Sequence, residues 1–429
     1  MKVAVVGAGV IGLTSAYHLL KDGHEVTLID AAVPGAGASH GNAGWIVPAN
    51  AGPVPAPGVV LQALKWMLKK DSPLYVRPSL QPNFARFMLT MARRCNRRDF
   101  RASFQANLRL FEGTLELLDA YAADGINFEM HSAGLIMAFV ERHVLNQHLT
   151  DLDITAEFGL RPEVLSGPAL AEREPALRPT LAGGIYFPQE RHIRPDALVS
   201  GLVSRCRELG ATFLEHTPVT DVRRDTRVRA VLTTSGVVEA DEYLLAAGAH
   251  SGPVSSLFGR ALPVRPGKGY SVDYRPAPVK LTSMVDLCDA RVAVTPLDGT
   301  LRLAGTMEFA GLDTTINAVR VRAIEQAPSR YFTKWHPERV QRAAPWAGAR
   351  PMTPDGLPII GMFPSLTNAW VATGHGMLGV TLGPATGRAL AEAMGTGTLP
   401  GVLAPFDPNR FRTGATRVRS ADSPGSQSL

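Results

Sequence analysis

Residues 2–30 place the tightest constraint on how this chain can fold. An apolar run at residues 3–6 is interrupted by the sequence GAGVIG at residues 7–12, and an apolar-faced segment typical of a helix follows. After a turn at Gly23, a second apolar run at residues 26–29 ends on Asp30. This order predicts a strand–turn–helix–strand unit with a G-x-G-x-x-G turn between the first strand and the helix.

The expected role of this turn is to bind a dinucleotide. Gly7 permits the tight turn, Gly9 lets the backbone approach a pyrophosphate, and Gly12 lets helix and strand pack closely. The pyrophosphate would lie at the helix N-terminus, where free N–H groups and the positive end of the dipole face it. Asp30, 18 residues after Gly12, can accept hydrogen bonds from a ribose diol, and its charge would repel a 2′-phosphate. The alternative is a strand–helix–strand unit with a purely structural role.

The composition favours a globular protein of a reducing compartment. The chain has 429 residues, of which 45% are hydrophobic, and this length suits two domains or one large interleaved one. Its cysteines, Cys95, Cys206 and Cys288, are widely spaced, which disfavours a disulfide framework or a zinc site, so we expect no metal. The apolar start is better explained by the glycine pattern than by a signal peptide, and no apolar run of about 18 residues could span a membrane.

The positive charge is concentrated in one stretch. The formal net charge is +6, yet residues 60–101 alone hold ten Lys and Arg residues against Asp71 and Asp99. Apolar residues such as Trp66, Phe87 and Leu89 are interleaved with these charges. Such a stretch can lie on an anionic bilayer surface, or it can be a solvated helix face whose other side joins the core. Nucleic-acid binding is not expected, because no nucleic-acid motif accompanies the charge.

The pattern after Asp30 predicts an interleaved organisation, because further strand–helix repeats do not follow. Residues 34–58 hold six glycines and five prolines, which indicates an ordered loop. We expect helices near residues 59–70, 80–95, 102–123, 141–158, 195–209, 317–333 and 380–394, with Val319, Ile324 and Phe332 of the sixth facing inward. Strands are expected at residues 135–140, 183–188, 212–216, 219–223, 228–234, 243–247, 262–274, 291–295, 300–306 and 369–372.

These elements predict an α/β fold of two discontinuous domains. A Rossmann-like dinucleotide-binding domain is expected from residues 1–58, 195–255 and 340–410. Residues 59–194 and 256–339 are expected to form an α+β substrate-binding domain with a mainly antiparallel sheet. Residues 411–429 lack apolar periodicity and are rich in Ser, Thr, Gly and Arg, so we expect a disordered tail.

Six segments together resemble a known family. They are GAGVIG at 7–12, NAGWIVP at 42–48, APGV and LKWM within 56–67, KGYS at 268–271, RPMTPDGLPIIG at 350–361 and TGHGMLG at 373–379. The first is common to many dinucleotide folds, whereas the other five are far more specific. Over nearly the whole chain up to about residue 410, the sequence resembles the FAD-dependent D-amino-acid oxidase superfamily, most closely its bacterial D-amino-acid dehydrogenase branch.

The resemblance implies FAD and a set of residues around it. Adenosine and pyrophosphate would lie on the first unit, with the loop from Ser39 to Trp45 near the flavin. The segment 374–380 would pass along the isoalloxazine ring, and the helix after it would point its N-terminus at the flavin edge that gains negative charge on reduction. The implied cofactor-binding residues are Gly7, Ala8, Gly9, Val10, Ile11, Gly12, Asp30, Ser39, Asn42, Gly44, Val219, Ala247, Gly248, Gly374, Met377, Leu378 and Gly379.

The resemblance also implies oxidative deamination of a D-amino acid. The substrate would give its α-hydrogen to flavin N5 as hydride, and the resulting imine would hydrolyse to a 2-oxo acid and ammonia. Arg350 is the expected carboxylate clamp, because its planar fork can bind both oxygens. Tyr270 would donate a hydrogen bond to the same carboxylate or line the pocket, and His375 would contact flavin or the substrate amine; both could instead be structural.

Three departures from related patterns narrow this interpretation. Met377 stands where some glycine-oxidising relatives place a second arginine, which would leave Arg350 as the sole clamp beside an apolar wall. The stretch 350–361 has no cysteine, although the sarcosine-oxidising branch attaches FAD there, so we expect non-covalent FAD. Residues 191–195 (RHIRP) depart from the dehydrogenase pattern and leave the exact substrate open.

Several functional alternatives remain at this point. Within the same fold, the substrate could be a cyclic or secondary amino acid such as cis-4-hydroxy-D-proline, D-proline, sarcosine or glycine. An NAD-dependent dehydrogenase or a silent subunit of a membrane complex are alternatives of other classes. The basic stretch at residues 60–101 favours a quinone of the respiratory chain over oxygen as acceptor. The expected location is therefore the cytoplasm, with possible peripheral contact on the cytoplasmic face of the inner membrane.

Overall fold

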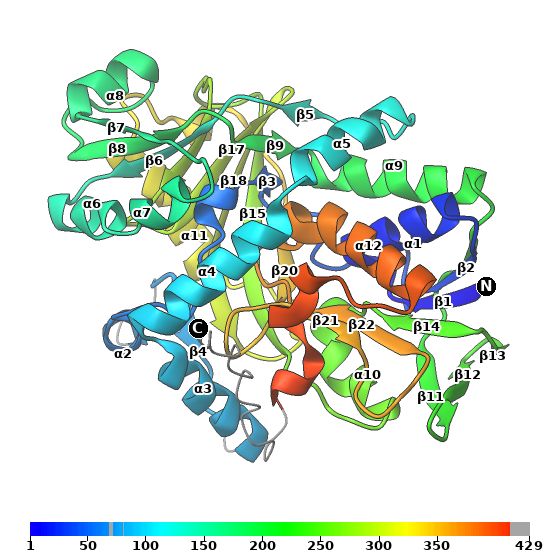
Figure 1. Ribbon diagram of the computed structural model, residues 1–429. Coiled ribbons are helices and arrows are strands. Elements are labelled where there is room, and N and C mark those ends of the chain that lie inside the picture. The colour runs from blue at the N-terminus through cyan, green and yellow to red at the C-terminus, as the bar shows by residue number, and fades with distance from the viewer. Residues whose placement is uncertain (68–71, 80, 412–429) are drawn as a thin grey trace, which may run out of the picture.

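The opening strand–helix–strand unit forms one side of a six-stranded sheet (Figure 1). In the computed structural model, which describes residues 1–67, 72–79 and 81–411, β1 spans Lys2–Val6, α1 Val10–Lys21 and β2 Glu25–Ile29. The sheet order is β10-β2-β1-β14-β22-β21. The other strands are β10 (Thr212–Leu214), β14 (Glu242–Leu245), β22 (Ala369–Thr373) and β21 (Ile359–Met362). All pairs are parallel except β21 with β22, which confirms the Rossmann-like expectation.

The apolar run of β1 reflects burial on both faces of this sheet. Val3 and Val5 join the cluster formed with α1 and α12, whereas Ala4 and Val6 join a cluster on the opposite face with residues such as Val222. Parallel strands that are covered on both sides need apolar residues at consecutive positions. The sequence of β1 therefore fits a central parallel strand rather than an alternating surface strand.

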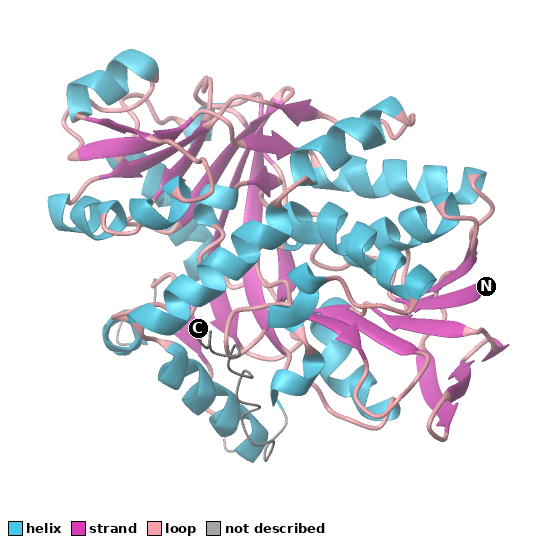
Figure 2. Cartoon of the chain, in the orientation of Figure 1, coloured by secondary structure: helices cyan, strands magenta, loops and turns pink. Residues whose placement is uncertain are grey.

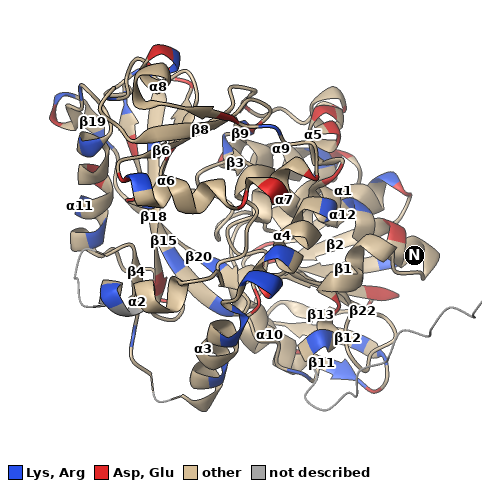
Figure 3. Ribbon diagram, turned by 60° about the vertical axis from the view of Figure 1, so that its left-hand side comes forward, with Lys and Arg blue, Asp and Glu red and all other residues tan. Residues whose placement is uncertain are grey.

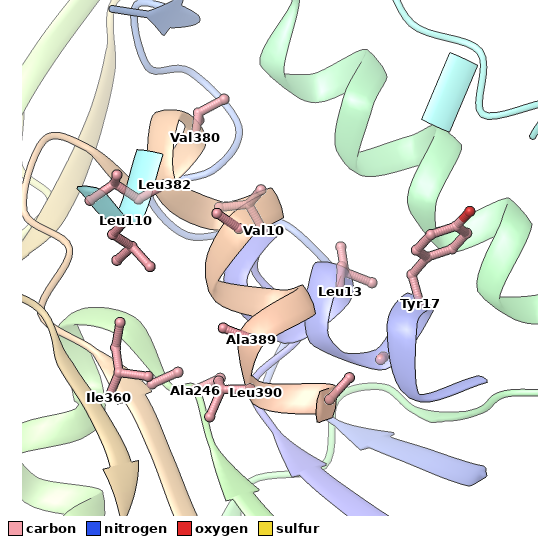
Figure 4. Close-up of a cluster of buried hydrophobic side chains, with 14 of the residues drawn as sticks. Val10, Leu13, Tyr17, Leu110, Ala246, Ile360, Val380, Leu382, Ala389 and Leu390 are labelled. Atoms are coloured by element: carbon pink, nitrogen blue, oxygen red, sulfur yellow. The ribbon is translucent and has the colours of Figure 1, made fainter. Parts of the chain in front are cut away.

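Two helices pack side by side on one face of this sheet. α12 (Gly379–Thr396) lies alongside α1, and Figure 4 shows Val10, Leu13, Leu382 and Leu390 in the cluster between and around them. The contact is close at the small residues of α12. A Cβ on Gly387 would lie 2.6 Å from the Thr14 carbonyl carbon, and the Thr14 hydroxyl donates to the Gly383 carbonyl at 2.9 Å. This packing brings the N-termini of the two helices together.

A ten-stranded, mainly antiparallel sheet forms the second large layer (Figures 1 and 2). Its order is β19-β15-β18-β17-β16-β6-β8-β7, with β20 on β15 and β4 on β18. The strands are β19 (Gln341–Arg342), β15 (Arg265–Arg275), β18 (Thr300–Phe309), β17 (Val292–Leu297), β16 (Met284–Leu287), β6 (Leu135–Phe139), β8 (Gly183–Phe187), β7 (Glu163–Leu165), β20 (Trp346–Met352) and β4 (Leu74–Val76). Only β16 with β6 and β18 with β4 run parallel, so the expected antiparallel character is confirmed.

Two smaller sheets and the remaining helices complete the described residues. One small sheet holds β11 (Val219–Arg224), β12 (Val228–Thr233) and β13 (Gly236–Val238), and the other β3 (Trp45–Ile46), β9 (Arg191–Ile193) and β5 (Met130–His131). The helices are α2 (Val59–Met67), α3 (Pro82–Arg94), α4 (Arg97–Phe111), α5 (Thr114–Ala123), α6 (Arg142–Leu149), α7 (Leu152–Ala156), α8 (Gly167–Arg173), α9 (Pro195–Glu208), α10 (Ser251–Leu257) and α11 (Ala318–Gln326). Most expected elements are present, while residues 412–429 of the expected tail lie outside the described residues.

Several sequence-based expectations need correction. The helices expected at 102–123 and 141–158 are each divided in two, into α4 and α5 and into α6 and α7. The helix expected at 317–333 ends at Gln326, and Val319 in its first turn is 48% exposed, whereas Ile324 and Phe332 are buried as expected. A short helix offers only one inward stripe, and here Val321 takes it with Ile324. Residues 341–352, expected in the dinucleotide-binding domain, pair with β15 in the second sheet. Strand pairing between distant residues leaves no local pattern in the sequence. The last segment of the dinucleotide-binding domain is therefore better placed after Met352, and the other domain boundaries remain predictions.

Candidate active site

The opening glycine turn has no room for side chains at two of its three glycines. Gly7 has φ +108°, and a Cβ there would lie 2.4 Å from the Ala246 carbonyl oxygen. A Cβ on Gly12 would lie 1.9 Å from the Gly7 carbonyl oxygen. These contacts are the close packing of strand and helix that the sequence predicts, so both positions require glycine for the turn itself.

Gly9 is different, because the space in front of it is largely open. A Cβ on Gly9 would meet only the Ser39 hydroxyl, at 3.3 Å, among the described residues. The Ser39 hydroxyl accepts a hydrogen bond from the Val10 amide at 3.0 Å, and the first turn of α1 carries no acidic residue. An uncovered glycine at a helix N-terminus is the surface that a pyrophosphate needs. The position therefore fits a dinucleotide phosphate rather than a packing requirement.

The Asp30 carboxylate lies at the carboxyl end of β2 and faces the same turn. One oxygen accepts from the Ala8 amide at 2.8 Å and the other from the Ala32 amide at 2.9 Å. Each carboxylate oxygen retains a further acceptor site for a ribose hydroxyl. The Thr217 amide donates to the Asp30 carbonyl at 2.7 Å, which places Val219, at the start of β11, in the same neighbourhood. The residues expected at the adenosine end of the site therefore lie close together.

The loop at residues 39–45 is held by side chains from the ten-stranded sheet and from α12. Its own Asn42 accepts from the Gly44 amide at 2.8 Å. Four further side chains donate to its carbonyl groups: Ser271 to Gly41 (2.7 Å), Arg302 to Asn42 (2.9 Å), Thr295 to Ala43 (2.8 Å) and Thr381 to Trp45 (2.9 Å). None of the four was predicted from the sequence, because a hydroxyl on a distant strand gives no local signal. β9 pairs with β3 at the end of this loop, and the Ile193 amide donates to the Gly44 carbonyl at 2.8 Å. The segment 191–195 is therefore in direct contact with the loop.

The closing glycine turn lies next to the opening one. A Cβ on Gly379, the first residue of α12, would lie 3.9 Å from a Val10 methyl carbon. Gly374 and Gly376 have φ values of +77° and +56°, which favour glycine. Among the described residues, α12 has no side-chain cap and no acid in its first turn. Its N-terminus is therefore available to stabilise negative charge, as expected for a reduced flavin edge.

The remaining residues expected near the flavin have distinct environments. Gly248 has φ +53° and no described atom within 4 Å of the position that a Cβ would take, and its carbonyl accepts from the Thr373 hydroxyl at 3.2 Å. Ala247 precedes it at the end of the β14 connection. Leu378 is buried, whereas the Met377 side chain is 55% exposed. Both residues line the small pocket that also contains Gly374 and Gly376.

His375 is a buried, neutral histidine with one unused nitrogen. Its Nε2 lies 3.1 Å from the Thr386 hydroxyl, while Nδ1 has no hydrogen-bond partner among the described residues. Burial lowers the pKa of His375 to about 3, so the ring is uncharged at neutral pH. A buried polar atom usually has a partner, which a water molecule, a cofactor or a substrate can supply. This observation fits a cofactor or substrate at the closing turn.

Arg350 is a half-buried cation that has no acidic partner among the described residues. It lies on β20, its guanidinium is stacked against the backbone of Gly269, and Nη1 donates to the Thr306 carbonyl at 2.8 Å. No carboxylate of the described residues forms an ion pair with it. Burial lowers the pKa of Arg350 to about 10, so the side chain stays charged at neutral pH. Two residues further along, Met352 lines a small pocket with Gly374, His375 and Gly376, which places the cation beside the closing turn.

The structure does not support a direct role for Tyr270 in binding substrate. Its hydroxyl donates to Glu308 at 3.0 Å, and the side chain is 1% exposed in the cluster covered by α11. Alternation along β15 places Tyr270 on the face opposite Gly269, against which Arg350 lies. The expected contact is therefore corrected: Tyr270 belongs to the core behind the site.

Comparison with known proteins identifies the family. The family model described as "FAD dependent oxidoreductase" (DAO) matches residues 2–393. The chain belongs to this family. Its members depend on FAD. The open face of Gly9, the N-terminus of α12 and Nδ1 of His375, which have no cap and no hydrogen-bond partner among the described residues, fit that cofactor. The enzyme class and the cofactor expected from the sequence are thereby confirmed.

Similar proteins cover nearly the whole chain. A D-amino acid dehydrogenase of Bradyrhizobium diazoefficiens is 33% identical over 405 residues, which are 92% of this chain and 95% of that protein. One of Cereibacter sphaeroides is 34% identical and covers 91% of each chain. Among solved structures, glycine oxidase from Geobacillus kaustophilus superposes with a TM-score of 0.77 at 24% identity, over 96% of this chain and 99% of that one. L-proline dehydrogenase from P. horikoshii gives 0.74 at 20% identity, over 96% and 97%. These structures share the fold.

Proposed function

We propose that this flavoprotein oxidises the α-amino group of D-amino acids to give 2-oxo acids and ammonia. Arg350 carries the proposal, because a half-buried cation that no described carboxylate neutralises is suited to bind the carboxylate that every amino acid presents. The names of relatives with 33–34% identity over more than nine-tenths of the chain support the same substrate class.

The polypeptide contributes position and electrostatics to this reaction. FAD, when bound, supplies the two-electron acceptor for the α-hydrogen. Arg350 fixes the substrate carboxylate, and the Thr306 carbonyl fixes Arg350 in turn. His375, uncharged and buried, can accept or donate a hydrogen bond through Nδ1 without adding charge beside an amine. Holding the reacting carbon in one orientation is the main source of rate in such a site.

The experiment that tests this function is anaerobic reduction of the protein-bound flavin by a substrate panel. The panel compares D-amino acids with their L-enantiomers, and adds D-proline, cis-4-hydroxy-D-proline, sarcosine and glycine. We expect rapid bleaching by D-amino acids with a primary amine and slow or no bleaching by the L-series. Faster bleaching by the cyclic or secondary amines would replace the proposal by the related reaction on those substrates.

We also propose that the flavin is bound without a covalent bond. The segment 350–361 contains no cysteine, and Cys206 and Cys288 are buried away from solvent. Denaturation with acid should therefore release all the yellow colour into the supernatant. Flavin fluorescence that stays with the polypeptide on a denaturing gel would contradict this proposal.

A quinone at a membrane surface is the electron acceptor that we propose. No helix among the described residues is long and apolar enough to cross a membrane. However, basic residues gather on α3 (Figure 3). The exposed residues of α3 and of the start of α4 include Arg86, Arg93, Arg94, Arg97 and Arg98, together with a 53% exposed Leu89. Clustered arginines beside an apolar side chain suit peripheral contact with anionic lipid. Lys69, Lys70 and Asp71 of the basic stretch lie outside the described residues.

Liposome sedimentation tests this surface. The holoenzyme should pellet with anionic vesicles at low salt and be released at high salt, because each basic residue near such a surface contributes about 1 kcal/mol. The double variant R86Q/R93Q should bind more weakly, whereas R229Q, on the distant strand β12, should bind like the wild type. Equal behaviour of the two variants would contradict the assignment of this surface.

A further inference from the structure

A second pocket lies at the beginning of β15 and contains two arginines. Arg77, which follows β4, and Arg265, the first residue of β15, line it together with Phe84, Pro266 and Phe309. Arg265 is half-buried, whereas Arg77 is exposed. The pocket therefore combines two cations with aromatic walls, in a part of the molecule that the proposed chemistry has not used.

Neither guanidinium in this pocket is neutralised within the described part of the chain. No hydrogen bond or ion pair is formed by the side chain of Arg77 or of Arg265 with a described residue. Asp313 interacts with Arg77 only at longer range, and this exposed acid lies 3.9 Å from the Lys268 ammonium group. Two arginines that share a pocket repel each other unless an anion lies between them. The pair is thus suited to bind a carboxylate, which their planar forks match.

One face of β15 connects this pocket with Arg350. Residues at alternate positions share a face of a strand, so Arg265, Gly267, Gly269 and Ser271 form one row. Ser271 donates to the loop at Gly41, and Arg350 lies against Gly269, where a Cβ would be 2.1 Å from Nη1. A Cβ on Gly267 would lie 2.4 Å from the Met307 sulfur and 2.7 Å from Met352 Cγ. From Ser271 to Arg265, the row passes four features in order: the loop at residues 39–45, the Arg350 guanidinium, the two thioethers and the arginine pocket.

The side chains between Arg350 and the pocket are apolar and adaptable. Met307, Met352 and Phe309 belong to one buried cluster, against which Phe84 of the pocket packs. Methionine side chains are unbranched and can rearrange around a ligand. The space over the two glycines of the row is filled by these thioethers and by the Arg350 guanidinium. A substrate side chain that reaches from the clamp to the pocket must therefore displace the thioethers, which their flexibility allows.

We propose that the Arg77–Arg265 pocket is a subsite for a second acidic group, carried at the end of the substrate side chain. This inference rests on the proposed function, because it takes Arg350 as the site of the α-carboxylate. The Cα atoms of Arg265 and Gly269 are separated by four strand residues, about 13 Å, and arginine side chains at both ends shorten the gap. Dicarboxylic D-amino acids such as D-glutamate and D-2-aminoadipate are the substrate class that this arrangement selects.

Calorimetric titration of the holoenzyme with glutarate and with its monoamide tests the subsite without turnover. The two ligands have the same length, and only glutarate carries a second charge. We expect glutarate to bind at least about tenfold more tightly, since a charge-assisted arginine contact is made by one ligand and not by the other. R265M and R77M should each remove this preference. R161M, which removes an exposed arginine from the loop before β7, should retain it. Thermal midpoints like that of the wild type show that the variants are folded.

Equal affinities of wild type for the two ligands, or a preference that survives in R265M and R77M, would overturn the subsite. Failure of the proposed function gives a different pattern. R350M should lower the affinity for both ligands by a similar factor. Unchanged affinities in R350M would show that Arg350 is not the carboxylate clamp. The comparison of R265M with wild type would still decide whether the subsite exists. In turnover, kcat/KM for D-glutamate relative to D-glutamine should fall about tenfold in R265M, with the value for D-methionine unchanged.

Discussion

The opening turn of the cofactor site is encoded within one short stretch of sequence, whereas the substrate half of the site is gathered from distant strands. Gly7, Gly12 and Asp30 lie within one strand–helix–strand unit, and Asp30 binds back to the Ala8 amide. Arg350, in contrast, lies on β20, is held by the Thr306 carbonyl on β18, and rests on Gly269 of β15. The first half depends on local backbone geometry, and the second depends on how strands pair in the ten-stranded sheet.

This difference predicts how each half fails when it is altered. A local turn with no spare volume should fail as a unit, so that both fold and cofactor are lost. A side chain held by tertiary contacts can be removed with the fold intact, because the strands that present it are stabilised by their own pairing. The following four variants and conditions test this contrast, from the largest expected effect to the smallest.

Gly12→Ala should abolish holoenzyme formation. The added Cβ would lie 1.9 Å from the Gly7 carbonyl oxygen, and backbone atoms cannot move away cheaply, so a destabilisation of about 4 kcal/mol or more is expected. Gly401→Ala is the matched control, because no described atom lies within 4 Å of its Cβ position and its φ is not in the left-handed region. Flavin content and thermal midpoint are the measurements. A yellow, stable Gly12→Ala protein would show that the opening turn is not constrained as described.

Arg350→Met should lower kcat/KM for a D-amino acid by roughly 10²- to 10³-fold, equivalent to about 3–4 kcal/mol. FAD should stay bound, because Arg350 lies on β20 and not in the opening turn. Arg350→Lys keeps the charge without the planar fork and should recover part of the loss. Steady-state kinetics with flavin content measured on the same sample checks both statements. Unchanged kcat/KM would remove Arg350 from the substrate site.

Acid should destabilise the protein through His18 of α1. Burial lowers the pKa of His18 to about 4 in the folded state, against 6.5 for an ordinary histidine. Between these values the unfolded chain binds the proton and the folded one does not, so the free energy of unfolding falls as the pH falls from 6.5 to 4. The expected loss from this group is on the order of 3 kcal/mol.

Denaturant unfolding of the holoenzyme across this pH range measures the effect. His18→Gln should flatten the dependence, with the exposed His143→Gln as the control for removal of an imidazole. Identical pH dependence in wild type and His18→Gln would contradict the assignment. That result would mean that acid does not destabilise the protein through the core between α1 and α5, where His18 Nε2 lies 2.9 Å from the Tyr121 hydroxyl.

Tyr270→Phe should have the smallest effect on turnover. We expect kcat/KM to change less than about threefold, because the hydroxyl points away from Arg350 and donates to Glu308. Stability should fall by about 1–2 kcal/mol, since a buried carboxylate loses one donor. Glu308 keeps Lys268 at 3.5 Å and Arg320 at 2.8 Å. A loss of kcat/KM beyond tenfold with unchanged stability would restore Tyr270 to the substrate site.

The sequence predicted local features better than those that depend on pairing. The glycine turn, the helix from Gly379 and the strand at Ala369 follow from apolar periodicity and backbone requirements within a few residues. The side chains that hold the flavin loop, Ser271 and Arg302 among them, could not be found, because their contacts join residues more than 200 positions apart. The expected contact of Tyr270 with the substrate failed for a related reason. The motif KGYS predicts a strand, but only the register of that strand in the sheet shows which face Tyr270 occupies.

Stopped-flow reduction of the holoenzyme flavin under anaerobic conditions, with wild type and Arg350→Met compared across D-methionine concentrations, tests the central claim most directly. We predict that wild type loses its oxidised flavin band at a rate that saturates as the D-methionine concentration rises. Arg350→Met, equally yellow at the start, should require roughly 100-fold more substrate. Flavin that no D-amino acid reduces in wild type, or identical concentration dependence in the two proteins, would contradict the account.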